Sequence, residues 1–256
     1  MIVLGILTVA MICLAATSVD PLRIAVAQEE NTGPNINVVR EVGGTLRLQT
    51  ASDKRFRGVE EWRIFVHADG SRTMTLTKDF IAANALQIMT AHVDADFRPI
   101  DVYATYWTLD GYRGSLRAAV DGNELRAVSE GPYGRIEDVV EVPHELSIVT
   151  HGESMNGWYL WQGERDDEGI HRATYFNFNP APDGSALVKG RLHPATYEYL
   201  GTETVTVPAG TFATERYLLG NIDIWSYAED RVLVKQSLRG DDKEYILTKL
   251  ELVTPE

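Results

Sequence analysis

The stretch Val205-Thr206-Val207-Pro208-Ala209-Gly210-Thr211-Phe212 decides the fold, because it has the pattern of two strands joined by a tight turn. Valine and threonine alternate before Pro208, as in a strand with one buried face. Pro208 presets φ for a turn, and Gly210 can adopt the positive φ that some turns require. The returning strand can then share one apolar layer with the first. The residues that would line this layer are Val205, Val207, Phe212 and Leu218.

Strand and turn signals continue on both sides of this hairpin. Downstream, strands are predicted at residues 222–227, 232–238 and 245–252. Upstream, turn signals such as Asp69-Gly70 and Asp110-Gly111 recur about every ten residues, as in all-β sandwiches and barrels. The upstream strands are predicted at residues 60–67, 72–77, 100–108, 115–120 and 124–128.

Helix is predicted to be a minor component. Only residues 78–85 and 154–160 could carry a helical turn, and neither segment has a sustained 3.6-residue period. The sequence therefore predicts an all-β fold, a curved antiparallel meander that forms a partly closed β barrel or half-barrel.

The hairpin and the strands after it resemble a widespread group of secreted bacterial domains of unknown function. The motif V-x-V-P-A-G-T-F is followed by Asp223-Ile224-Trp225, Val232-Leu233-Val234-Lys235 and Tyr245-Ile246-Leu247. These domains are similar in architecture to the periplasmic lipoprotein-localisation carriers. The resemblance, over residues 197–253, implies a curved sheet around an apolar cavity and a periplasmic location. It transfers no catalytic residue, because fold does not fix chemistry.

The first residues have the composition of an export signal. The apolar run from Ile2 to Ala16 is short for a membrane span and long enough for a signal-peptide core. Ala25-Val26-Ala27 offers a cleavage site, with Ala16-Thr17-Ser18 as a rival. Because no Lys or Arg precedes Ile2, an uncleaved anchor is the alternative. Cys13 lies within the run and is interpreted as a discarded apolar residue.

The mature chain is expected to be one exported domain. Residues 1–27 are assigned to the signal peptide, 28–38 to a flexible lead-in and 39–256 to a single β domain, which could consist of two packed halves, 39–151 and 170–256. Without Cys13 no cysteine remains for disulfides or thiolate metal ligation. We expect a periplasmic protein with no stable membrane span after cleavage. The sequence does not indicate an oligomeric state.

Charge and missing motifs exclude several function classes. The formal net charge of −13 opposes binding to nucleic acid and other polyanions. The sequence contains no Gly-rich phosphate loop, no G-x-S-x-G elbow and no H-E-x-x-H pair. The acidic stretch 163–169 lacks the alternating spacing of a calcium loop and is interpreted as a solvated loop. No metal site and no cofactor are predicted.

Two histidines are the candidates for proton transfer. His144 and His151 flank a short apolar strand at residues 146–149, next to an aromatic-rich segment. An imidazole near its unperturbed pKa of about 6.5 can act as acid or base. The alternative is that both rings make ordinary structural or solvent hydrogen bonds.

Large aromatic residues are the candidates for ligand binding. Such side chains can wall a cavity and orient a ligand, or they can simply fill a β core. Tyr133 and Arg135 could bind a carboxylate or phosphate at a cavity rim, or they could form an exposed turn and strand edge. The candidates are Trp62, Tyr106, Trp107, Tyr133, Arg135, Trp158, Trp161 and Trp225.

Three functions fit these observations. The leading hypothesis is a periplasmic binding or carrier protein for an apolar or amphipathic small molecule or lipid, which predicts a continuous apolar cavity inside the sheet. The second is a cofactor-independent isomerase, lyase or hydrolase of a hydrophobic small molecule, which predicts a histidine and a carboxylate within hydrogen-bond reach. The third is a cell-envelope scaffold, which predicts a filled interior and an exposed apolar patch.

Overall fold

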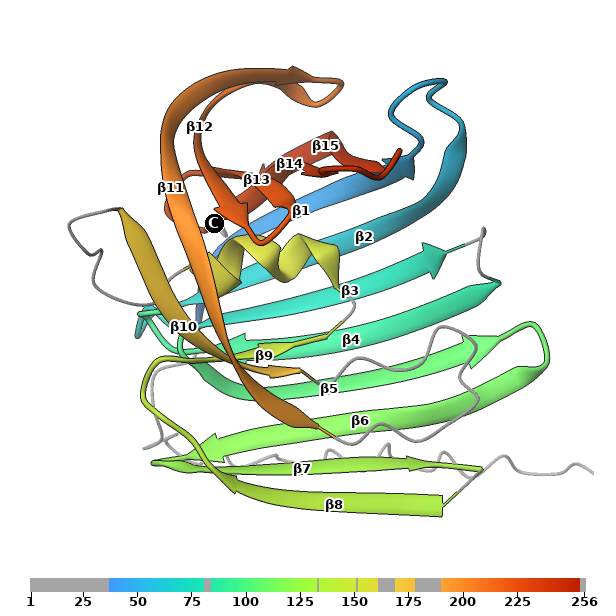
Figure 1. The fold of residues 1–256 in the computed structure, drawn as a ribbon, viewed down its shortest axis with the longest axis vertical. Coiled ribbons are helices and arrows are strands. Elements are labelled where there is room, and N and C mark those ends of the chain that lie inside the picture. Colours follow the sequence, from blue (N-terminus) through green and yellow to red (C-terminus); the bar gives the residue numbers. More distant parts are fainter. Residues whose placement is uncertain are drawn as a thin grey trace, which may run out of the picture. The chain divides into compact units, whose positions relative to one another are not determined.

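A computed structural model describes residues 37–80, 84–132, 134–150, 152–160, 169–177 and 190–253. These residues form one 15-stranded sheet and one 3-10 helix, η2 (Glu153–Leu160), which confirms the predicted all-β, mostly antiparallel fold (Figure 1). The strands are β1 (Val38–Gln49), β2 (Phe56–His67), β3 (Arg72–Phe80), β4 (Ala85–Val93), β5 (Pro99–Thr108), β6 (Gly111–Asp121), β7 (Glu124–Gly131), β8 (Gly134–Glu141), β9 (Leu146–Val149), β10 (Ile170–Asn177), β11 (Arg191–Val207), β12 (Gly210–Leu219), β13 (Ile222–Tyr227), β14 (Val232–Leu238) and β15 (Glu244–Val253).

The strand order is that of a long meander with its ends unjoined. The sheet runs β8-β7-β6-β5-β4-β3-β2-β1-β15-β14-β13-β12-β11-β10-β9. Pairing is antiparallel throughout, except between β9 and β10, which are parallel. Strands β1 to β8 are consecutive antiparallel neighbours, and so are strands β10 to β15. Pairing of β1 with β15 joins these two runs into one sheet. β8 and β9 are the two edges, and the sheet is therefore not closed into a barrel.

The hairpin formed by β11 and β12 has the predicted register. Val205 pairs with Phe212 across the two strands, and Gly210 has a φ of +142° at the turn. Val205, Val207 and Phe212 are buried, whereas Leu218 is only partly buried.

Of the two segments that could carry a helical turn, one does so. Residues 154–160 lie within η2, but Lys78 to Phe80 belong to β3 and Ala85 to β4, so no helical turn is described in the first segment. Lys78 is instead an inward-facing strand residue that alternates with outward Thr77 and Asp79. The expected signal peptide, the flexible lead-in as far as Ile36 and the acidic stretch 163–168 lie outside the described residues.

η2 packs on the inner face of the sheet, the face that carries the apolar core. All residues from Ser154 to Leu160 are buried, and η2 contacts β2, β9, β13 and β14. Gly157 permits this approach, because a Cβ there would lie 2.0 Å from the carbonyl oxygen of Arg231. Figure 1 shows η2 crossing β2 and β3, with β11 and β12 arching over β13 to β15. Within the described part of the chain, no helix is long and apolar enough to cross a membrane.

Candidate functional site

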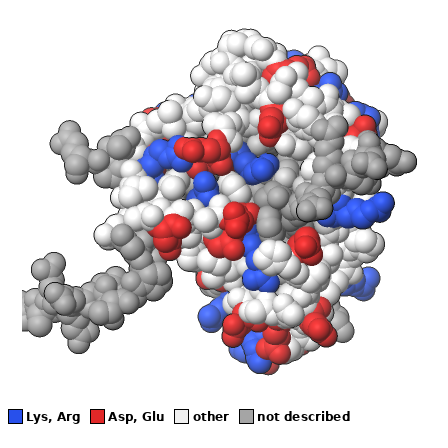
Figure 2. Space-filling view, turned by 90° about the vertical axis from the view of Figure 1, so that its left-hand side faces the viewer, with Lys and Arg blue, Asp and Glu red and all other residues white. Residues whose placement is uncertain are grey.

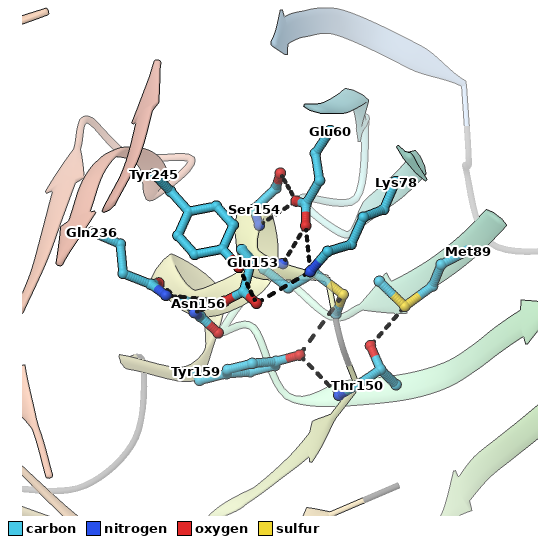
Figure 3. A network of polar contacts seen from close by, with 11 residues as sticks. Glu60, Lys78, Met89, Thr150, Glu153, Ser154, Asn156, Tyr159, Gln236 and Tyr245 are labelled. Carbon is cyan, nitrogen blue, oxygen red and sulfur yellow. Dashed lines mark hydrogen bonds and ion pairs between the residues drawn. The ribbon is translucent and has the colours of Figure 1, made fainter. Parts of the chain in front are cut away.

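A buried polar network fixes η2 to the sheet (Figure 3). Glu60 on β2 is 2% exposed, and its carboxylate oxygens accept the backbone N–H groups of Glu153 and Ser154 at 3.0 and 2.9 Å. The Ser154 hydroxyl donates another hydrogen bond to Glu60 at 2.7 Å. The backbone N–H groups in the first turn of a helix have no acceptor within the helix, and Glu60 supplies acceptors for two of them.

Lys78 on β3 lies between two carboxylates. Its Nζ is 3.2 Å from Glu60 Oε1 and 3.2 Å from Glu153 Oε1. Burial opposes the positive charge, but Glu153 and Glu60 together outweigh it and hold the pKa of Lys78 above its ordinary value of 10.5. The buried lysine therefore stays charged at neutral pH.

Glu153 has partners on both of its oxygens. Tyr245 donates its hydroxyl to Oε1 at 3.1 Å, and Asn156 Nδ2 and Gln236 Nε2 each donate to Oε2 at 3.0 Å. Burial, together with the nearby carboxylates, raises the pKa of Tyr245 and keeps it a hydrogen-bond donor. Every carboxylate oxygen in the network is thus engaged by the chain itself. We interpret the network as the anchor of η2, not as a reaction centre.

The interior beside η2 is filled by aromatic packing. Trp158 meets Phe97 edge-on, with ring centroids 5.9 Å apart, and donates its indole N–H to the carbonyl of Asp230 at 3.0 Å. Among the described residues, the space between η2, β9 and the β4–β5 pair measures about 20 Å³. That volume holds about one water molecule. The continuous interior cavity expected of a carrier is not seen in this part of the chain.

Among the described residues, two larger hollows lie on the outer face of the sheet, the face opposite η2. One is a groove of about 440 Å³ that crosses β15, β1, β2, β3 and β4. Its size is within the range of about 300–1,000 Å³ that is typical of small-molecule sites. Strand alternation and register align two rows of outward residues along it: Glu251, Gly43, Arg63, Thr75 and Thr90 in one, and Lys249, Thr45, Glu61, Thr77 and Ile88 in the other.

Two adjacent glycines in β1 serve opposite faces. A Cβ on Gly43 would have its nearest neighbours at 3.8 Å, so a side chain there would extend into the groove. A Cβ on Gly44 would lie 2.3 Å from Cζ2 of Trp62, which covers this glycine. Gly43 therefore keeps the groove open, and Gly44 makes room for a core tryptophan.

Charges of both signs line the groove near β2 and β15. Arg63 forms an ion pair with Glu41, and Lys249 is paired with Glu251 at 2.7 Å. The hydrogen bond from Lys249 holds the pKa of Glu251 below its usual value. Within the described part of the chain, Glu61 forms neither a hydrogen bond nor an ion pair, so it is the carboxylate in the groove that is left open to a ligand.

An apolar hollow adjoins the groove at Ile88, which lines both. This second hollow measures about 640 Å³; its large apolar residues are Leu86, Trp107 and Leu109, and Asp79 also lines it. Ile88 is 45% exposed and Leu109 is 82% exposed. Trp107 packs edge-on against Tyr112, with centroids 5.8 Å apart. We call the groove and this hollow together the outer channel.

The outer channel changes character from one strand to the next. Charged side chains lie on β15 and β2, and threonine hydroxyls lie on β1, β3 and β4. The large apolar side chains lie on β4 and β5, with Asp79 of β3 and Thr108 of β5 as polar groups beside them. Neighbouring strands are about 4.8 Å apart, so Glu61 on β2 and Trp107 on β5 are separated by about 14 Å across the sheet.

The predicted aromatic candidates do not gather at one place. Trp62 and Tyr106 are buried on the inner face, and neither Trp62 Nε1 nor the Tyr106 hydroxyl has a partner in the described part of the chain. Trp158 is buried in η2. Trp225 is buried on β13, where the guanidinium of Arg216 and the Nζ of Lys235 each lie 4.9 Å from its ring centroid. Of these five, Trp107 lines the apolar hollow and Trp62 also borders the groove.

The remaining candidates are exposed or undescribed. Arg135 lies on edge strand β8 and pairs with Glu130 and Glu137, so its charge is neutralised by its own strand and the neighbouring one. His144 is exposed before β9. His151, Tyr133 and Trp161 lie outside the described residues, and their predicted roles stay predictions. Among the described residues, no group of three His, Cys, Asp or Glu side chains could hold a metal ion.

Charges are mixed elsewhere on the surface too. Figure 2 shows Lys and Arg side chains lying next to Asp and Glu side chains across one face of the molecule. A paired cluster within the described residues is Arg216 and Arg239 around Asp223, at 2.9 and 2.7 Å. Their hydrogen bonds hold the pKa of Asp223 below its usual value.

The described residues define an all-β, mostly antiparallel protein with an open sheet and ligand-sized hollows on its outer face. No family model and no curated protein matches the chain. Among solved structures, it is similar to a β-barrel-like protein with the domain of unknown function DUF1849 from Brucella abortus, at 13% identity and a TM-score of 0.49, over 85% of this chain and 99% of that one. It is also similar to a DUF1089 family protein from Pseudomonas aeruginosa, at 10% identity and a TM-score of 0.40, over 71% and 89%. These likenesses give no evidence on function.

Proposed function

We propose that the protein binds or carries a single-chain amphipathic molecule on the outer face of its sheet. The polar end of this molecule would lie in the groove near β2, and its apolar chain would cross β4 and β5. The single observation that carries the proposal is Ile88, which joins a charged and hydroxyl-lined groove to an apolar hollow. An amphiphile is the kind of molecule that can satisfy both parts at once.

The proposed ligand position differs from the interior cavity that the sequence suggests. Inside the sheet, η2 occupies the place that a ligand would take, and the described residues leave about 20 Å³ beside it. On the outside, the two hollows of about 440 and 640 Å³ are open. Export to a periplasm, as the N-terminal sequence predicts, would place such a carrier between two membranes and is part of the same proposal.

Burial of an exposed apolar side chain by the ligand supplies the driving force. A large apolar side chain contributes about 1.5–3 kcal/mol when it moves from full exposure to full burial. Ile88, Leu109 and Leu86 are 45%, 82% and 36% exposed, so burial of each by a ligand would contribute part of this free energy. The affinity is therefore expected to rise with the length of the acyl chain until the chain extends past β5.

Equilibrium binding of a lysophospholipid below its micelle concentration, measured by Trp fluorescence and calorimetry, tests this proposal. Ile88→Asn should weaken binding at least fivefold, because it puts an amide at the joint of the two hollows. The matched control is Val139→Asn on edge strand β8, an exposed β-branched residue outside the channel. Equal affinity of both variants and the wild type would contradict the proposal.

An envelope scaffold is the second candidate. A filled interior with an exposed apolar surface is what this function requires, and Tyr103 and Tyr112 extend the exposed apolar surface beyond the channel, at 48% and 42% exposure. The two functions differ in stoichiometry. Saturable binding of one amphiphile per chain favours the carrier, whereas non-saturating binding with no effect of Ile88→Asn favours a protein-contact surface.

A further inference from the structure

The charges of the groove select among amphiphiles. Both cations in it already have carboxylate partners: Arg63 is paired with Glu41, and Lys249 with Glu251. An anionic head group would have to compete with these carboxylates. The free group in the described part of the groove is Glu61, and a free carboxylate attracts a cation.

Glu61 lies in a setting that suits an ammonium group. In the strand register, Thr45 on β1 and Thr77 on β3 are its direct neighbours on the outer face. Side chains at such cross-strand positions have their Cβ atoms about 4.5–5.5 Å apart. One carboxylate flanked by two hydroxyls offers four acceptor oxygens, enough for the three N–H donors of a primary ammonium.

We infer that the amphiphile has a zwitterionic head group, whose ammonium is held by Glu61 between Thr45 and Thr77. The inference rests on the proposed function and adds the chemical class of the ligand. Arg63 lies two residues further along β2, about 6–7 Å away, on the same face. Gly43 leaves the groove open beside Arg63, so the phosphate of the same head group has room there. Because Arg63 is already paired with Glu41, the phosphate meets the same competition in every phospholipid, and the selectivity comes from the ammonium.

The net charge of the whole chain also favours a zwitterionic over an anionic ligand. A formal net charge of −13 repels anionic amphiphiles and anionic membrane surfaces. A zwitterion carries no net charge, so this repulsion does not oppose its approach. The preference for zwitterionic over anionic lipids should therefore have two causes. One is the local attraction of the ammonium to Glu61, and the other is the general repulsion of anions by the net charge, which salt screens.

The test compares lysophospholipids with the same acyl chain and different head groups: ethanolamine, glycerol and, as an uncharged reference, a monoacylglycerol. Dissociation constants of the full chain are measured below the micelle concentration at low and high salt. The ethanolamine lipid should bind more tightly than the glycerol lipid. Glu61→Gln should weaken ethanolamine-lipid binding by about two- to fivefold, the range of an exposed ion pair, and leave the monoacylglycerol unchanged.

A matched control separates this local effect from the general charge. Glu141→Gln on β8 removes one exposed carboxylate outside the groove and should not change the discrimination. Equal or tighter binding of the glycerol lipid, or an unchanged preference in Glu61→Gln, would overturn the inference while the proposed function stands. Absence of binding to all three lipids would refute the proposed function as well.

Discussion

Replacing Lys78 with methionine tests how η2 is held in the sheet. The substitution keeps the length and apolar stem of the side chain but leaves Glu60 and Glu153 without their shared cation. Removal of one partner from a buried ion pair costs about 3–5 kcal/mol, because the remaining charge is buried without compensation. The total free energy of unfolding of a domain is only about 5–15 kcal/mol. Lys78→Met should therefore lose a large share of the stability at neutral pH.

Urea denaturation followed by circular dichroism gives the magnitude. Lys243→Met is the matched control, because Lys243 pairs with Asp241 at the surface, and such pairs contribute about 0–1 kcal/mol. A loss below about 1 kcal/mol at neutral pH would refute the structural role that we assign to the network.

Two further predictions concern the glycines of β1 and alkaline pH. Gly43→Ala should stabilise the fold by about 0.5–1 kcal/mol, because glycine is unfavourable within a strand and its Cβ has space. Gly44→Ala should destabilise the fold by about 1–3 kcal/mol through the clash with Trp62. Equal changes in the melting temperature of the two variants, measured by thermal denaturation, would contradict these assignments. The pKa values of Lys78 and Tyr245 are raised in the folded state, so their contribution is complete below the ordinary values of 10.5 and 10.0 and is lost as pH rises beyond them toward the folded-state values. Stability that stays constant from pH 9 to 11.5 in denaturation experiments would exclude this linkage.

The sequence predicts the hairpin architecture because local signals suffice for it. The turn at Pro208-Ala209-Gly210 and the alternation of Val205 and Val207 each constrain one strand pair, and this pair forms in the predicted register. The closing contact between β1 and β15 joins residues about two hundred positions apart, and no local pattern encodes it. The same holds for the place of η2, since its buried position depends on Glu60 and Gln236 from distant strands.

The outer channel was harder to predict than the fold. The predicted aromatic ligand contacts Trp62 and Trp158 pack in the core, and of these two Trp62 also borders the groove. The channel is lined mainly by threonines and paired charges, which in a sequence look like an ordinary solvated strand face. One signal was present: Gly43-Gly44 within a strand indicates a close approach or an open surface. Its meaning required the register that aligns Gly43 with Arg63 and Thr75.

Methyl NMR spectroscopy of the full chain during titration with a lysophospholipid measures the location of the ligand most directly. We expect the methyl resonances of Ile88, Thr77 and Thr90 to shift in a saturable way. The methyl groups of Ile64 and Met155, which lie on the inner face and in η2, should remain unchanged. Shifts confined to Ile64 and Met155, with Ile88 unaffected, would place the ligand inside the sheet and contradict binding on the outer face.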